Sequence, residues 1–209
     1  MEEILKKKKV FNQRFIEPVT NLYYQLETFN SGYFVVIPQA ITRCYFFDTN
    51  NTFSVFVALI SWFDENGQRD VSRSILAEHS RVTVRTLDKA LKELVSKGFI
   101  SKKGNAHNNE KDANTYTLSD LTKNPYIILS EAIYTTKYGI RDARLRDSIE
   151  NFVYPLQKEK SPLLKRIEVT AENDITTAYI IACEAVARHL RDELGINIET
   201  PIKREIPLI

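Results

Sequence analysis

The residues best suited to chemistry in this sequence are cations and hydroxyl groups, and they gather in one stretch. From Arg69 to Lys103 there are nine Lys or Arg and four Asp or Glu, a net charge of +5. The whole chain of 209 residues has a net charge of only +2, so the rest of it carries −3. Guanidinium and ammonium groups form charge-assisted hydrogen bonds to phosphate oxygens. Positive charge concentrated in this way predicts a surface that meets a polyanion.

Two short helices joined by a turn are predicted to hold these cations. Ser72 is placed to cap the first helix and Thr83 the second, because each hydroxyl can accept a hydrogen bond from a free amide of the following turn. Residues 80–82 between the helices are too few for more than a turn. The apolar side of the first helix is predicted to consist of Ile75, Leu76 and Ala77.

The second helix is predicted to have one apolar and one polar side. Its apolar residues recur with the period of an α-helix, and they are Val84, Leu87, Ala90, Leu91, Leu94 and Val95. Lys97 and Gly98 are expected to end the helix, since a cation suits the last turn and glycine adopts the left-handed conformation that follows it. The residues that point away from the apolar stripe are Arg85, Thr86, Lys89, Lys92 and Ser96.

Two antiparallel strands are predicted after the helices, at 99–103 and 115–118. The polar segment 104–114 between them is expected to be a loop that contacts the phosphate backbone or enters the minor groove of a nucleic acid, and a flexible loop without such contact is the alternative. Glu110 and Asp112 dilute the positive charge of this segment. The cationic or imidazole side chains in or beside it include Lys102, Lys103, His107 and Lys111.

An apolar helix at 53–63 is predicted to lie beneath the helix pair as a scaffold. Trp62 in this helix is expected to be a core residue rather than one that stacks on bases, because its neighbours are apolar. Residues 64–67 are expected to form the turn that follows. Residues 33–37 are aromatic and β-branched and predict a strand, whereas residues 41–47 are compatible with either a short helix or a strand.

Four short motifs give this part of the chain a likeness to a known family. They are LAE at 76–78, VTVRTL at 82–87, LKEL at 91–94 and GFI at 98–100. The stretch resembles the winged helix-turn-helix modules of phage and plasmid replication proteins and of bacterial transcription regulators. The run 33–38, followed by an apolar helix, is similar to the start of such modules in replication initiators. The likeness extends from about Gly32 to Leu121.

The resemblance implies that the second helix of the pair lies in the major groove of double-stranded DNA. Arg85 and Thr86, in the first turn of that helix, are expected to contact base edges. The other candidates are expected to contact phosphates or to add non-specific affinity. The complete set of predicted DNA-binding residues is Ser72, Arg73, Arg81, Thr83, Arg85, Thr86, Lys89, Lys92, Lys102, Lys103, His107 and Lys111.

The expected architecture is mainly α with a small β-wing, an N-terminal winged helix-turn-helix domain being followed by a helical C-terminal domain. The predicted segments are a basic N-terminal extension at 1–31, the winged helix-turn-helix domain at 32–121, a helical dimerisation domain at 122–195 and an extended tail at 196–209. The lysines at 6–9 are interpreted as a solvated face, with contact to phosphate as the alternative.

The C-terminal domain is predicted to contain four helices, at 126–138, 141–157, 162–169 and 174–194. Asn124 and Pro125 indicate where the first of them begins. Asn173 or Asp174 is expected to cap the last helix, and Gly195 to end it.

The last of these helices is apolar nearly all round from Ala178 to Ala187, apart from Glu184. A helix of this kind is buried, either in the core of its own chain or against a second copy. We expect a homodimer on this basis.

No constellation of catalytic or metal-binding residues is recognisable in the sequence. The histidines at 79, 107 and 189 are far apart and lack metal-ligand spacing with one another or with Cys44 and Cys183. The six glycines form no phosphate-binding loop, and no nucleophile elbow is present. We therefore predict no enzymatic activity, no cofactor and no bound metal. A nuclease or relaxase site assembled from residues distant in the sequence is the alternative.

The composition favours a cytoplasmic protein that does not enter a membrane. No apolar run reaches the ~18 residues that a membrane-spanning helix needs. The four lysines at 6–9 are not followed by the apolar core of a signal peptide. Since nothing indicates secretion, the two cysteines are expected to be reduced thiols.

These features lead to the hypothesis of a sequence-specific double-stranded DNA-binding protein that acts in replication initiation or maintenance of a plasmid or phage. A transcriptional regulator with the same winged helix is the first alternative, and the location of the bound site distinguishes the two. The second alternative is a protein-interaction module whose basic face is merely solvated. The predicted partners are double-stranded DNA, a second copy of the chain, and replication or transcription proteins.

Overall fold

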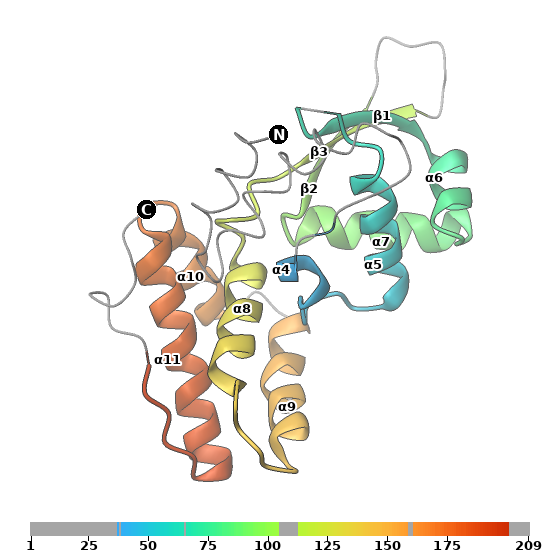
Figure 1. The fold of residues 1–209 in the computed structure, drawn as a ribbon. Helices are drawn as coiled ribbons and strands as arrows, with labels where there is room; N and C mark the ends of the chain where they lie inside the picture. Colours follow the sequence, from blue (N-terminus) through green and yellow to red (C-terminus); the bar gives the residue numbers. More distant parts are fainter. Residues whose placement is uncertain (1–36, 38, 65, 105–112, 159–160, 201–209) are drawn as a thin grey trace, which may run out of the picture. The chain divides into compact units, whose positions relative to one another are not determined.

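A computed structural model describes residues 37, 39–64, 66–104, 113–158 and 161–200 (Figure 1). Within these residues the protein is mainly helical, with eight helices and one three-stranded antiparallel sheet. The chain divides into two compact units. Phe47–Leu121 belongs to one, and Gln39–Phe46 belongs with the residues from Thr122 onward to the other. The expected basic extension, and the strand at 33–37 apart from Ile37, lie outside the described residues.

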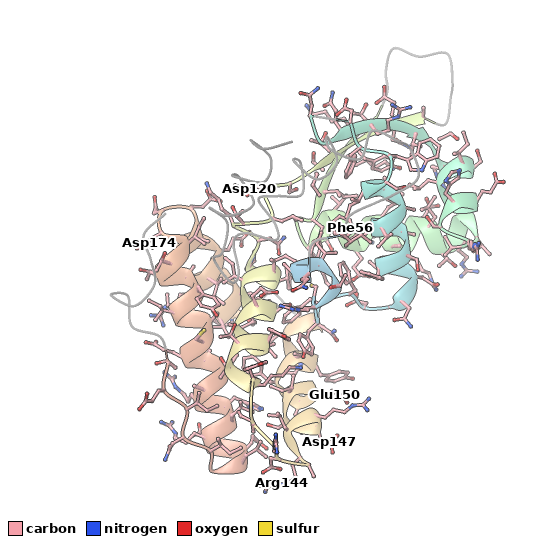
Figure 2. The ribbon with its side chains drawn as sticks, viewed as in Figure 1. Phe56, Asp120, Arg144, Asp147, Glu150 and Asp174 are labelled. Carbon is pink, nitrogen blue, oxygen red and sulfur yellow. The ribbon has the colours of Figure 1, made fainter. Side chains whose placement is uncertain are left out.

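The scaffold helix of the first unit is α5 (Asn50–Ile60), which begins and ends three residues earlier than predicted. It begins there because the hydroxyl of Thr49 caps it by accepting a hydrogen bond from the Thr52 amide. Phe56 of α5, labelled in Figure 2, is fully buried against the rings of Phe47 and Phe99, at centroid distances of 5.8 and 5.4 Å. The expected place of this helix in the core is therefore confirmed.

The sheet contains the two strands predicted after the helix pair and a third strand that was not predicted. The strands are β1 (Gln68–Ser72), β2 (Ile100–Gly104) and β3 (Ala113–Leu118), in the antiparallel order β1-β3-β2. Only Val71 of β1 is buried, so the strand lacks the alternation of apolar residues by which strands are recognised. Its structure comes from pairing with β3, where Arg69 lies opposite Tyr116.

The predicted pair of helices is present as α6 (Arg73–His79) and α7 (Val84–Ser96). The hydroxyls of Ser72 and Thr83 cap them, as expected, by accepting from the amides of Ile75 and Thr86. The turn at 80–82 and the end of α7 at Lys97, followed by Gly98 with a φ of 69°, are also as expected.

The apolar stripes of these two helices are narrower than predicted. Ile75, Val84 and Val95 are 42%, 43% and 41% exposed, so none of them is a core residue. At ~100° per residue, Val84 and Val95 lie about 80° round the helix from the centre of its buried side. The residues of α7 that do form the core are Leu87, Ala90, Leu91 and Leu94.

The second unit contains the four predicted C-terminal helices. They are α8 (Pro125–Lys137), α9 (Leu145–Lys158), α10 (Pro162–Ala171) and α11 (Ile175–Leu194). Asn124 and Asp174 cap α8 and α11, and Gly195 ends α11 in the left-handed conformation. Helix α9 begins four residues later than predicted, because Asp142 accepts a hydrogen bond from the Arg144 amide in a turn that precedes the helix.

Helix α11 is buried by the other helices of its own unit. It packs against α8, α9 and α10, and Figure 1 shows α8 and α10 beside it. Ala182, Val186 and Leu190 are fully buried in these contacts. Burial within one chain thus accounts for the apolar character of α11, which no longer provides an argument for a dimer.

Helix α4 (Gln39–Thr42) and the turn after it belong to the same unit, although the sequence grouped them with residues 32–121. The Tyr45 amide donates to the hydroxyl of Ser130 at 3.1 Å, and Gln157 donates to the Tyr45 carbonyl at 2.9 Å. Residues 41–47, for which helix and strand were both open, therefore begin in a helix and continue in a turn that α8 and α9 hold through Tyr45.

Candidate nucleic-acid interface

The outward side of α7 is cationic. Arg85, Lys89 and Lys92 are all exposed there, together with Ser96. At ~100° per residue these positions lie directly opposite the buried side of the helix. The structure therefore gathers three of the predicted DNA-binding side chains on one face of a single helix, and that face carries no acidic residue.

The two acidic residues of α7 lie on its flanks, where each is bound by a cation of the same unit. Asp88 forms an ion pair with Arg73 of α6. Glu93 lies 3.0 Å from the Lys97 ammonium, and it also accepts a hydrogen bond at 2.5 Å from the Thr52 hydroxyl. Both carboxylates are thus paired on the flanks of α7, and Arg85, Lys89 and Lys92 form no ion pair with another described residue.

Lys97 belongs to the charge cluster of the sequence but not to the surface. Its side chain is only 6% exposed, and its ammonium lies 2.6 Å from Asp48 and 3.0 Å from Glu93. The Asp48 amide also donates to Glu93, at 2.8 Å. Lys97 therefore connects the start of α5 to the end of α7, and the exposed cluster is smaller than the sequence count indicated.

Arg73, which was predicted to contact phosphate, is also engaged within its unit. Besides its ion pair with Asp88, it lies near the buried Tyr116. Burial raises the pKa of the Tyr116 hydroxyl, while the Asn114 side chain and the Arg73 charge oppose that rise. Arg73 thus holds the first turn of α6 against α7.

Seven of the nine cations between residues 69 and 103 are exposed. None of the seven has an ion pair with another residue in the described part of the chain. They are Arg69, Arg81, Arg85, Lys89, Lys92, Lys102 and Lys103. Arg69 was missed as a candidate because its strand was not predicted, although its charge was counted.

The turn between α6 and α7 is formed without glycine. Arg81 has a φ of 54° and is the one non-glycine residue with a positive φ in the described ranges. That conformation costs a residue with a side chain about 1–2 kcal/mol. Ser80 is buried, and its hydroxyl donates to the Leu76 carbonyl at 2.6 Å. In this turn the buried Ser80 hydroxyl has a hydrogen-bond partner, and Arg81 adopts a left-handed conformation that glycine would adopt more easily.

The first turn of α7 has a positive electrostatic character. It contains no acidic residue, and its free amides point beyond the helix, where the helix dipole favours an anion. The hydroxyl of Thr86 lies 3.0 Å from that of Thr83 and belongs to the cap, and the Thr86 side chain is half-buried. Of the two residues predicted to contact bases, Arg85 is exposed, whereas the Thr86 hydroxyl is hydrogen-bonded within the helix cap.

The remaining candidates are distributed around the sheet. Lys102 lies opposite Tyr116 and Lys103 opposite Thr115, so the two lysines project from opposite faces of β2. Ser72 uses its hydroxyl as the cap of α6. His107 and Lys111, with most of the predicted loop, lie outside the described residues.

Trp62, predicted as a core residue, lies in the turn after α5 and is half-buried. Its indole Nε1 donates to Nδ1 of His79 at 3.3 Å, and the two rings meet edge to face at a centroid distance of 4.6 Å. The pair thus links the ends of α5 and α6. This contact has no signal in the sequence because the two residues are 17 positions apart.

No family model matches this chain, and the comparisons with curated proteins and with solved structures found no significant match. No three His, Cys, Asp or Glu side chains of the described ranges come close enough together to hold a metal ion. The helices in the same ranges include none with the length and apolar character needed to cross a membrane.

Proposed function

We propose that residues 47–121 form a winged helix-turn-helix domain that binds double-stranded DNA, with α7 in the major groove. One observation carries the proposal. The outward side of α7 presents Arg85, Lys89 and Lys92 without an acidic residue, while both carboxylates of the helix are bound on its flanks. A merely solvated helix face usually mixes charges of both signs. The separation seen here favours a polyanionic ligand over the protein-interaction alternative.

The three cations have different roles in this proposal. Arg85 lies in the first turn of α7, the part of such a helix that comes nearest the base edges. Its fork of donors matches O6 and N7 of guanine. Lys89 and Lys92 lie one and two turns further on and contact phosphates, as point charges do. The first turn of α7 thus recognises bases, and the following turns bind the DNA backbone.

Arg81 supports the same ligand. A glycine would adopt the turn conformation without strain, whereas the arginine adopts it at a cost in stability. A guanidinium next to the start of α7 adds positive charge where the helix dipole already favours an anion. We assign Arg81 to a phosphate beside the groove.

The salt dependence of binding tests the proposal directly. Fluorescence anisotropy of a labelled random duplex is measured against the full chain between about 50 and 200 mM salt. For each phosphate that is neutralised, the slope of log K against log salt should steepen by about 0.9. The variant Lys89→Ala/Lys92→Ala should bind more weakly and lose about two units of that slope.

A matched control separates local contact from total charge. Lys165→Ala/Arg166→Ala removes the same two charges from the exposed side of α10 and should keep the wild-type slope. Equal slopes for the wild type and the α7 variant would show that this face does not meet DNA. Absence of duplex binding at low salt would exclude the function altogether.

Arg85→Ala tests base recognition separately. It should reduce the preference for a duplex selected from a random library over an unselected one by roughly 10-fold, the loss of one good base contact. Sequence-specific recognition through α7 is wrong if that preference is unchanged. The location of the selected site, in origin repeats or at a promoter, then distinguishes replication of a plasmid or phage from transcriptional regulation.

A further inference from the structure

We propose that Val84 contacts the C5 methyl group of a thymine in the major groove and thereby selects one base pair of the binding site. This inference rests on the proposed function, because it requires α7 to lie in the groove. The inference adds a residue that determines specificity and that a search for hydrogen-bonding side chains would not find, because valine has no polar group.

Packing within the domain covers Val84 only in part. The side chain is 43% exposed, whereas the four residues that attach α7 to its unit are 3% exposed or less. Helix formation does not favour a valine here, since valine is a poor helix former and is stiff at its first side-chain torsion. Val84 is thus a stiff apolar group that is partly exposed, next to Arg85 in the sequence and directly after the Thr83 cap.

Val84 lies on a flank of α7, at the end of the helix that the proposed function places nearest the bases. It is the first residue of α7, and the first turn of a groove-binding helix lies nearest the base edges. Its neighbour Arg85 is the exposed candidate for base contact in the same turn. In the proposed complex, an apolar side chain at the start of α7 packs against the base edge that it faces and loses contact with water there.

The chemistry of the groove selects the occupant. The major-groove edges of the bases present hydrogen-bond donors and acceptors, and the thymine methyl is their apolar group. Valine cannot satisfy a donor or acceptor, so packing it against one would leave a polar group desolvated. Against a methyl group, both surfaces gain from the removal of water. A thymine therefore fits Val84 better than the other three bases.

Val95 provides a matched control in the same helix. It is also a valine, is 41% exposed, and lies on the same flank as Val84. It is 11 residues further along, about 16 Å at the rise of an α-helix. A general effect of removing an exposed valine from α7 should appear at both positions, whereas contact with a base should appear only at Val84.

The experiment uses the full chain and a duplex selected from a random library. Each thymine of the selected site is replaced in turn by deoxyuridine, which lacks only the C5 methyl group, and affinity is measured by anisotropy. One replacement should weaken binding of the wild-type protein about 4-fold, the effect expected for burial of one methyl group. Val84→Ala should bind the thymine and deoxyuridine duplexes equally, while Val95→Ala should keep the wild-type difference.

The outcomes separate the two proposals. If no duplex binds, the proposed function is wrong and this inference with it. If a duplex is selected but no deoxyuridine weakens binding, or if the loss persists in Val84→Ala, DNA binding stands and the role of Val84 is refuted. The deoxyuridine series with wild-type protein is independent of how well any variant folds.

Discussion

Replacing Glu131 by glutamine should remove a pH-dependent loss of stability from the helical unit. Glu131 lies in the middle of α8 and is 1% exposed, and its Oε1 has no hydrogen-bond partner in the described ranges. Burial raises the pKa of this carboxyl group from its ordinary value of 4.5 to about 7, although the Arg43 charge opposes the rise. The folded protein therefore holds a proton on Glu131 at a pH where the unfolded chain has lost it.

The sign and size of the effect follow from this difference. Below pH 4.5 the carboxyl group is protonated in both states, so its contribution to stability is complete. As the pH rises towards 7, the unfolded state alone ionises, and the free energy of unfolding falls by about 1.4 kcal/mol per pH unit. Above pH 7 both states are ionised and the loss ends. Between pH 5 and pH 8 the total loss is about 2–3 kcal/mol.

Urea denaturation followed by circular dichroism at pH 5 and pH 8 measures this loss. The unfolding free energy of Glu131→Gln relative to wild type should rise by about 2–3 kcal/mol between the two pH values. This change is independent of any constant cost of placing an amide in the core. Glu184→Gln, on the exposed side of α11, should behave as wild type does. If Glu131→Gln follows the wild type between the two pH values, the buried carboxyl group is not protonated and the reasoning fails.

Two further predictions concern the unit that carries α7. Lys97→Met should lower the free energy of unfolding by about 3 kcal/mol, because it leaves Glu93 and Asp48 without their cation, and the urea midpoint measures this. An unchanged midpoint would show that the ion pair contributes nothing. Arg81→Gly should raise the free energy of unfolding by about 1 kcal/mol by relieving the left-handed conformation. The same variant should bind duplex DNA more weakly in the anisotropy assay, and a gain in both quantities would contradict the role assigned to Arg81.

The local sequence was sufficient to predict those helix ends that are fixed by a capping residue or a glycine. The hydroxyls of Ser72 and Thr83 satisfy amides three positions away, and Asn124 does the same at the start of α8. Gly195 ends α11 because glycine alone adopts its conformation without strain. In each case the donor, the acceptor and the steric limit lie within one helical turn, so the printed order of residues already contains them.

Contacts between distant residues decided the rest, and no local pattern could have supplied them. Strand β1 exists because β3, some 45 positions later, pairs with it. The net charge of the sequence included Lys97, which the fold buries between Asp48 and Glu93. The helical periodicity placed Val84 in the core, but the contact between α5 and α7 is too narrow to bury it. Periodicity alone could not show the width of that contact. Sequence therefore supplied the cations of the candidate site, and tertiary packing determined which of them reach the surface.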